Sequence, residues 1–128
     1  MINMKGLTHF TIPVSDLKRA KEFYVDTLGF KFERENPHMV FVSCQDDFFV
    51  LTLSETPINP NQGDKHDIHT AFYVDADEYD RAIAFLKEKN IHIIMDEERH
   101  GDATFTGRSV YFHDPDRNVL EFHDSDKG

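Results

Sequence analysis

The sequence has 128 residues, 39% of them hydrophobic, and a formal net charge of −10 at pH 7, which suits a globular domain or two small halves that share one core. The sequence lacks the excess of basic residues typical of a nucleic-acid-binding protein, and no apolar run approaches the roughly 18 residues of a membrane span. We therefore expect neither nucleic acid nor a membrane as a partner. Cys44 is the single cysteine and excludes an internal disulfide; because the start also lacks the apolar core of a signal peptide, the sequence predicts a cytoplasmic protein.

The first half of the chain predicts one strand, one helix and three further strands. HFTIPVSD, residues 9–16, alternates as a strand does, and Ser15 or Asp16 can cap a helix behind it. Gly29 is placed to end that helix in the left-handed conformation. The helix takes its apolar stripe from Leu17, Ala20, Phe23, Tyr24 and Leu28. The strands that follow are FKFERE at 30–35, HMVFVSC at 38–44 and FFVLTL at 48–53.

The second half repeats this order after a linker at residues 54–67, which is rich in Pro, Asn and Gly. A strand begins at His69, Asp75 or Asp77 can cap the next helix, and Asn90 can end it. The helical stripe is Tyr79, Ala82, Ile83 and Leu86, and the later strands are IHIIM at 91–95, GRSVYFHD at 107–114 and NVLEFHD at 118–124, with a polar loop at 97–106. Both halves follow the order β-α-β-β-β, so the sequence contains an internal repeat with a period of about 60 residues.

The repeat makes His9 and His69 equivalent, because each opens the first strand of its half. Side chains alternate along a strand, so Glu121 shares a face with His123 and points away from the neighbouring apolar residues. We expect an α+β fold in which two βαβββ modules form a curved mixed sheet cup with helices on the outer face. His9, His69 and Glu121 would then meet in the trough of this cup and bind a divalent metal with open positions left for a substrate.

Two segments carry a resemblance to a known family. HFTIPVSD with the helix end EFYVDTLGF, and the strand–turn–strand YFHDPDRNVLEF, resemble the vicinal oxygen chelate superfamily, which includes glyoxalases, extradiol dioxygenases, fosfomycin-resistance thiol transferases, methylmalonyl-CoA epimerase and bleomycin-resistance proteins. The resemblance covers about residues 5–124 and implies one glyoxalase-like domain over 1–128, with module one at about 5–55 and module two at about 66–124.

The resemblance implies the same three metal ligands, His9, His69 and Glu121, with Fe2+ as the leading expectation and Mn2+, Ni2+ or Zn2+ as alternatives. Aligning VLEF with VLTL places Thr52 at the family's fourth ligand position, where glyoxalases and the epimerase use an additional carboxylate or amide. Three ligands are more similar to the extradiol dioxygenases and the fosfomycin transferases, so ring cleavage by a dioxygenase leads, with a glyoxalase-like lyase or isomerase also open.

Further residues refine this interpretation. Tyr111, His113 and His123 are the predicted catalytic groups, with the imidazoles as acids or bases and the phenol steadying an intermediate. The predicted substrate-binding residues are Thr11, Thr52, Tyr73, Ser109, Phe41 and Phe49. HDIH at residues 66–69 is read as part of a strand, where its two rings would point to opposite faces and would not bind one ion together.

Two other functions stay open at this point. A fosfomycin-type thiol transferase is favoured by Thr11, Ser109 and Tyr111, but it needs cations for an anionic substrate; Arg108 lies on the opposite strand face, and no Lys stands in the loop at 97–106. A bleomycin-resistance-type protein that binds a cationic drug without catalysis is favoured by the acidic charge. In each case the partner is a small molecule, and the paired modules favour a homodimer, swapped or unswapped.

Overall fold

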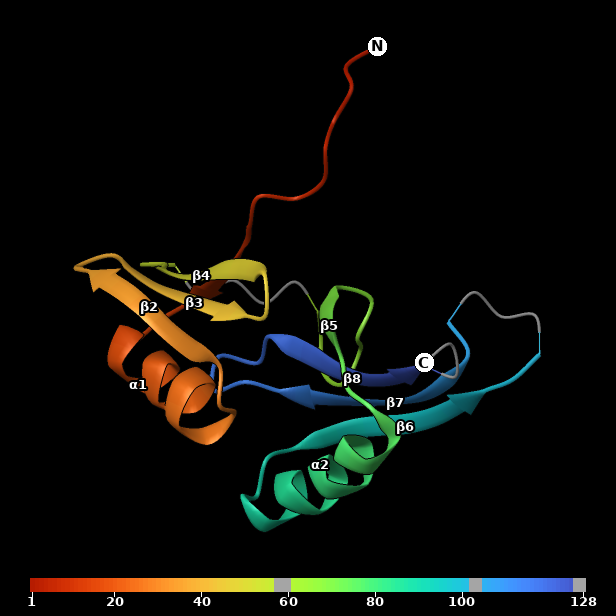
Figure 1. The fold of residues 1–128 in the computed structure, drawn as a ribbon. Helices are drawn as coiled ribbons and strands as arrows, with labels where there is room; N and C mark the ends of the chain where they lie inside the picture. The colour runs from red at the N-terminus through yellow and green to blue at the C-terminus, as the bar shows by residue number, and fades with distance from the viewer. Residues whose placement is uncertain (57–60, 102–104, 126–128) are drawn as a thin grey trace. The chain divides into compact units, whose positions relative to one another are not determined.

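The structure is a computed structural model that describes residues 1–56, 61–101 and 105–125, and contacts between Cα atoms divide the chain into two compact units, residues 1–58 and 59–128 (Figure 1). The first unit contains β1 (Phe10–Val14), α1 (Leu17–Lys21) continued by the π-helical segment η1 (Glu22–Thr27), β2 (Lys31–Asn36), β3 (Met39–Cys44) and β4 (Asp47–Leu53). The second contains β5 (His69–Tyr73), α2 (Ala76–Glu88), β6 (Ile93–Arg99), β7 (Gly107–His113) and β8 (Val119–Ser125).

Each unit forms one four-stranded mixed sheet, and the two sheets share a topology. The strand orders are β1-β4-β3-β2 and β5-β8-β7-β6. In both, the first strand lies parallel to the last, and the remaining pairs are antiparallel. Both sheets also have a register shift in their first antiparallel pair. The prediction of an α+β fold built from two βαβββ modules is therefore confirmed.

The helices begin and end at residues that the sequence marked. The Asp16 carboxylate accepts a hydrogen bond from the Arg19 backbone N–H at 3.0 Å, and the Asp75 carboxylate caps α2 in the same way. Gly29 follows the first helix with φ of +91°, and Asn90 follows α2 with φ of +56°. The π-helical turn of η1 was not predicted, because the apolar stripe has ordinary α-helical spacing.

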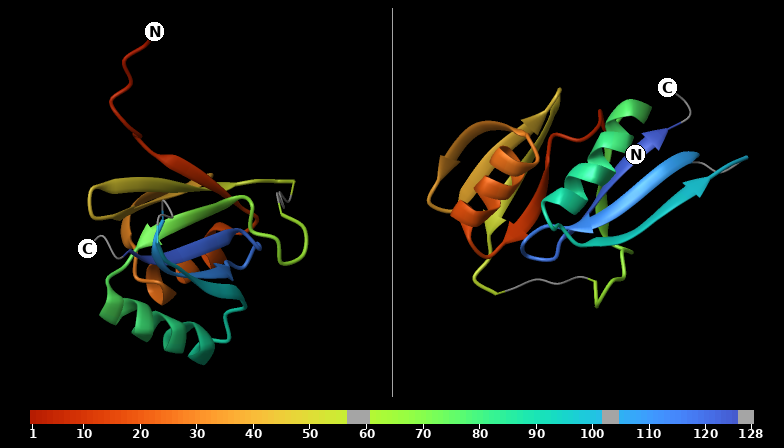
Figure 2. Two further views of the ribbon diagram at one scale, coloured as in Figure 1. Left: turned by 90° about the vertical axis from the view of Figure 1, so that its right-hand side faces the viewer. Right: turned by 90° about the horizontal axis from the view of Figure 1, so that it is seen from below.

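Each sheet buries one face beneath its own helix, as Figure 2 shows from two sides. In the first unit this core contains Tyr24, Val40, Val42, Phe49 and Leu51, all 1% exposed or less. In the second it contains Leu86, Val110, Phe112 and Leu120, again no more than 1% exposed. The opposite face of the second sheet carries polar strand residues such as Ser109 and Glu121, whereas that of the first sheet also carries the apolar residues Phe41 and Val50.

The turn between β7 and β8 is held by Asp114. Its side chain accepts hydrogen bonds from the backbone N–H groups of Asp116 and Asn118, each at 2.8 Å. Arg117 has φ of +65°, a left-handed conformation that costs a non-glycine residue about 1–2 kcal/mol. Its guanidinium donates to the Gly63 carbonyl at 2.9 Å, which ties the turn to the segment that precedes β5.

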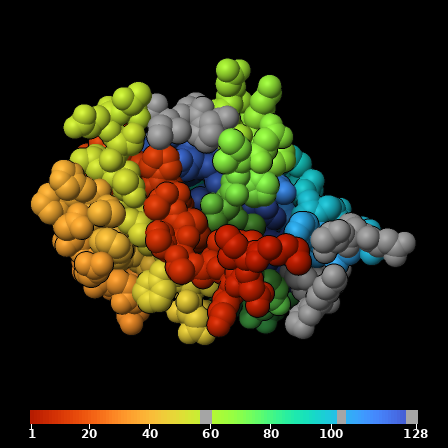
Figure 3. All heavy atoms as spheres, turned by 90° about the horizontal axis from the view of Figure 1, so that it is seen from above, coloured from red at the N-terminus to blue at the C-terminus, as the bar shows by residue number. Residues whose placement is uncertain are grey.

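The segment before β1 presents its side chains to solvent. Residues 1–9 are all exposed, and their atoms are among the red spheres of Figure 3. Among the described residues, neither helix is long and apolar enough to cross a membrane.

Candidate metal centre

Two of the three predicted metal ligands meet on the open face of the second sheet. His69 opens β5 opposite Val119, and Glu121 lies two residues further along β8 on the same face. The His69 Nε2 and Glu121 Oε1 atoms are 3.0 Å apart. Glu121 is 4% exposed, so its buried negative charge needs compensation from neighbouring groups such as His69.

The His69 ring is held in one orientation and one tautomer. Its Nδ1 lies 2.5 Å from the His66 carbonyl oxygen, an atom that can only accept a hydrogen bond. Nδ1 therefore carries a proton, and Nε2 is the ring nitrogen that faces Glu121. A backbone carbonyl behind a metal-binding imidazole is a common means of fixing the ring for its ion.

The HDIH segment differs from the prediction for it, because His66 precedes β5 rather than lying within a strand. The two rings are 6.2 Å apart, and the His66 ring packs 4.4 Å from that of Tyr111. The loop closes on itself: the Asn61 side chain donates to the Ile68 carbonyl at 2.6 Å and accepts from the Ile68 N–H at 3.0 Å. His66 thus supports His69 through its backbone, a role that strand parity could not reveal.

A cavity of about 550 Å³ opens over this pair. Its lining residues, all in the second unit, are His69, Ala71, Phe72, Tyr73, Arg99, Phe105, Tyr111, Glu121 and His123. The predicted residues Tyr73, Tyr111 and His123 therefore lie in one cavity with the two ligands. His113 lies elsewhere, with its ring stacked 5.3 Å from that of His92 and outside this lining.

Arg99 also lines this cavity, and the sequence interpretation missed it. The stretch from residue 97 was read as a polar loop, whereas β6 continues to Arg99 and pairs it with Gly107. The pairing of Glu97 with Ser109 places Arg99, two residues on, over the face that also carries Ser109 and Tyr111. The alternation of Met95, Glu97 and Arg99 was the available signal, because their side chains share one face.

Hydrogen bonds connect the polar residues of the cavity. The Arg99 guanidinium donates to Ser109 Oγ at 3.1 Å, and this oxygen lies 2.9 Å from His123 Nδ1. Glu97 bonds Arg99 and accepts from the Tyr111 hydroxyl at 3.1 Å. Burial, followed by the Glu121 charge, raises the pKa of Tyr111, which keeps its phenol protonated and able to donate.

The third predicted ligand, His9, belongs to the first unit and is exposed immediately before β1. Its Nδ1 lies 2.9 Å from the Thr8 hydroxyl. It lines a separate cavity of about 380 Å³ with Thr8, Glu33, Arg34, Phe41, Phe48 and Val50. Phe41 thus lines a cavity as expected, and the Arg34 guanidinium covers its ring at 4.1 Å.

Phe49 lines neither of these two cavities, because it is buried on the helix side of its sheet, so this part of the substrate-binding prediction finds no support. Val42 and Phe49 pair across β3 and β4 on the helix side of the sheet, whereas Phe41 pairs with Val50 on the open side. The Phe49 ring is 1% exposed and stacks 5.0 Å from that of Phe10. Strand parity assigns Phe41 and Phe49 to opposite faces.

Strand register also corrects the alignment that made Thr52 the counterpart of Glu121. Glu121 pairs with Ala71, two residues after His69, and Thr11, two residues after His9, pairs with Val50. The counterpart of Glu121 is therefore Val50, which offers no ligand atom. Among the described residues, Thr52 has the only buried side-chain oxygen without a hydrogen-bond partner, while Thr11 is exposed on β1.

The donor set of the second unit fits a divalent metal. Within the described part of the chain, the ion-pair partners of Glu121 are His69 and His123, at 3.0 and 3.7 Å, so no lysine or arginine neutralises it. An imidazole nitrogen and a carboxylate oxygen at this separation can share a cation, and such N and O donors suit Fe2+, Mn2+, Ni2+ or Zn2+.

Comparison with known proteins accounts for this arrangement. The model of the Glyoxalase/Bleomycin resistance protein/Dioxygenase superfamily matches residues 6–122. The chain belongs to this superfamily. Within it, the chain is 30% identical over 121 residues to the metallothiol transferase FosB of Staphylococcus epidermidis, covering 94% of this chain and 84% of FosB.

Other superfamily members share the length or the fold. The uncharacterized protein YaeR of Escherichia coli strain K12 is 29% identical over 133 residues, which cover 97% of this chain and 99% of YaeR. The fosfomycin resistance protein FosX of Listeria monocytogenes, solved with Mn(II) and sulfate, has a TM-score of 0.78 and 21% identity, over 96% of this chain and 92% of FosX. At that identity the FosX likeness shows the fold.

Proposed function

We propose that this protein is a metal-dependent enzyme that acts on a small, oxygen-rich anionic substrate, with a phosphonate as the leading class. The observation that carries the proposal is the presence of the His69–Glu121 pair and the Arg99 guanidinium in the lining of one cavity. A metal-ligand pair and a fixed cation side by side suit a substrate that offers a metal-binding oxygen and an anionic group.

The proposed metal ligands of the second unit are His69 and Glu121, and an ion bound by them would polarise a substrate oxygen, while His9 stays a predicted third ligand. Arg99 orients the anionic group of the substrate through its guanidinium, and Ser109 keeps that guanidinium in place. Tyr111 donates from a hydroxyl that stays protonated. His123, which lines the same cavity, supplies a proton to the oxygen released when a strained ring of the substrate opens.

Arg99 changes the balance between the functions that the sequence left open. A thiol transferase acting on a phosphonate needs a cation beside the substrate, and Arg99, which is also ion-paired with Glu97, supplies a guanidinium in the cavity lining. The similarity to FosB, a metallothiol transferase, supports the same reaction class. In this reaction a thiol sulfur bonds to an epoxide carbon, the carbon–oxygen bond breaks, and the thiol proton ends on the new hydroxyl.

The test is an assay of fosfomycin opening with L-cysteine, with glutathione and with water alone. The protein is loaded in turn with Mn2+, Ni2+, Zn2+ or Fe2+, and the product is followed by phosphorus NMR. We expect metal-dependent consumption that is lost in Glu121→Gln and weakened in Arg99→Ala, with Glu98→Gln as an exposed-carboxylate control. Equal rates with and without metal, or equal rates for Glu121→Gln and the parent protein, would refute the proposal.

A ring-cleaving dioxygenase is the second candidate, because the His123 ring lies in the cavity 3.7 Å from Glu121 and can accept the proton of a catechol hydroxyl. The assay is oxygen uptake by the Fe2+-loaded protein with a panel of catechols. Uptake that requires both Fe2+ and catechol would favour this candidate over the transferase.

The proposed assembly is a homodimer, and the proposed location is the cytoplasm. Closed twofold symmetry is the commonest arrangement among soluble homo-oligomers, which supports the first of these. Light scattering on the purified protein measures the mass of the assembly directly.

A further inference from the structure

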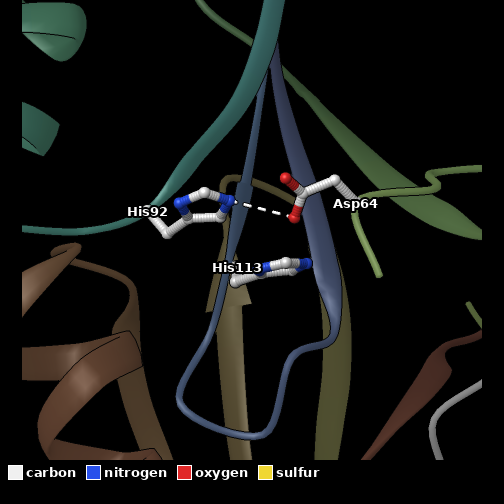
Figure 4. A group of neighbouring side chains, drawn as sticks. All are labelled: Asp64, His92 and His113. Atoms are coloured by element: carbon white, nitrogen blue, oxygen red, sulfur yellow. Dashed lines mark hydrogen bonds and ion pairs between the residues drawn. The ribbon is translucent and has the colours of Figure 1, made fainter. Parts of the chain in front are cut away.

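A second group of ligand-type side chains lies in the same unit but outside the cavity. Asp64, His92 and His113 each present one ligand atom, and these atoms lie within 4.8 Å of one another. His92 Nε2 is 3.0 Å from Asp64 Oδ1, and the His92 and His113 rings stack at 5.3 Å with an angle of 23° (Figure 4). His113 is buried, whereas Asp64 and His92 are exposed.

The backbone brings these three residues together from separate segments. His113 ends β7 and donates its backbone N–H to the His92 carbonyl at 3.2 Å, just before β6 begins. Asp64 follows Gly63, whose carbonyl accepts a hydrogen bond from Arg117 in the β7–β8 turn at 2.9 Å. Each ligand therefore stands on a segment with its own backbone anchor.

We propose that Asp64, His92 and His113 form a second metal site, for a divalent transition ion of the Zn2+ class. Two imidazoles and a carboxylate are a standard donor set for such an ion, with a fourth position left for water. Ligands about 2.0–2.1 Å from a tetrahedral ion lie about 3.3 Å from one another, so the present separations need to close by roughly 1.5 Å at most. The two exposed side chains are free to make that movement.

The site differs from a simple ion pair. An Asp64–His92 pair explains the 3.0 Å contact, but it gives no reason for a buried imidazole to stack on the same ring. Burial, helped by the charge of Arg117, lowers the pKa of His113, so the ring is neutral. Arg117 also opposes a cation here, and the Asp64 carboxylate offsets that charge.

An ion at this site would join three segments: the loop that carries Asp64, the start of β6 and the end of β7. The loop is the one that Asn61 and Ile68 close and that ends at His69. The second ion would therefore stabilise the backbone that presents His69, without sharing any ligand with the candidate metal centre.

The test removes the candidate centre first. In the double variant His69→Ala/Glu121→Gln, we expect one Zn2+ per chain by calorimetric titration, and one Co2+ with the visible absorption of tetrahedral coordination. Adding His92→Ala or Asp64→Asn should weaken Zn2+ binding at least tenfold. His100→Ala is the matched control, because its exposed ring lies 3.7 Å from Glu98 with no third ligand among the described residues, and it should leave binding unchanged.

Thermal unfolding in the metal-free state checks that each variant folds, and Zn2+ should raise the unfolding midpoint of the double variant but not that of its His92→Ala derivative. The proposal is overturned if the double variant binds no Zn2+, or if folded His92→Ala and Asp64→Asn derivatives bind it as the double variant does. Fosfomycin or catechol turnover by the parent protein is a separate readout, so either proposal can fail alone.

Discussion

The two units share a topology and a register, yet they carry different chemistry on their open faces. In the second unit, Glu121 pairs with Ala71, the residue two places after His69. In the first unit, Val50 pairs with Thr11, the residue two places after His9. Around Glu121 stand His69, His123 and Arg99, whereas the face around Val50 contains aromatic rings and exposed charges. Both units thus have the same strand pairing, but most of the ligand-type residues lie in the second unit.

The difference also shows in how polar groups are satisfied. Ser109, at 0% exposure in the second unit, bonds both Arg99 and His123. Thr52 in the first unit buries its hydroxyl without a partner among the described residues. The second unit therefore has a connected polar network, and the first has an isolated buried hydroxyl, which costs stability.

The strongest test of the difference between the two units removes one carboxylate from each of them. Glu121→Gln should lower metal affinity by about 100-fold or more, because it deletes a charged ligand. Glu33→Gln is the matched control: Glu33 lines the first unit's cavity and accepts from the Ser43 hydroxyl at 2.8 Å. Metal titration by calorimetry measures both, and equal losses would mean that the units do not differ as described.

The next largest effect concerns the two arginines. Arg99→Ala should raise KM for an anionic substrate by about 10- to 100-fold, since a charge-assisted hydrogen bond contributes about 1.5–3 kcal/mol. Arg34→Ala removes a guanidinium that covers the Phe41 ring in the first unit and should leave KM within about twofold. Steady-state kinetics on the substrate identified by the fosfomycin assay decides; a larger KM change in Arg34→Ala would contradict the assignment.

A smaller effect sharpens the contrast in polar satisfaction. Thr52→Val should raise the free energy of unfolding by about 1 kcal/mol, because it removes an unsatisfied buried hydroxyl. Ser109→Ala should lower it by about 1–2 kcal/mol, because it leaves Arg99 and His123 without their shared partner. Urea unfolding of the metal-free variants measures both signs, and the same sign for the two would count against the comparison.

The smallest effect is a pH dependence that belongs to α2. Burial raises the pKa of Tyr79 to about 12, above the value of about 10 in an unfolded chain. The folded state therefore holds this proton more tightly, so its contribution to stability is present below about pH 10 and is lost as pH rises through 12. Tyr79→Phe should flatten the alkaline decline seen in chemical unfolding, whereas Tyr73→Phe, an exposed phenol, should not.

The sequence was sufficient for the fold and for part of the candidate site. Alternation along the last strand predicted that Glu121 points away from the core, and the internal repeat indicated His69. Both the alternation and the repeat can be read directly from the sequence. Asp16, Asp75, Gly29 and Asn90 marked the helix ends for the same reason: caps depend on local chemistry.

The residues that were missed depend on where strands end and on which loops meet. Arg99 was hidden because EER looks like loop composition, and only pairing with β7 extends β6 that far. His113 was predicted as a catalytic group, but its cluster with Asp64 and His92 was not, because the three residues are 28 and 21 positions apart along the chain and two of them lie outside regular elements. Thr52 was aligned by letters, whereas the ladder that defines equivalence is a tertiary feature.

The hydrogen bonds of Asn61 with Ile68 end one residue before β5, where His69 stands with its Nδ1 proton already committed to the His66 carbonyl. An arriving ion thus meets a nitrogen whose tautomer and direction are set in advance. For the proposed metal, binding to His69 and Glu121 would require the ion to shed water but no rearrangement of the second unit's backbone, which keeps the entropic penalty small.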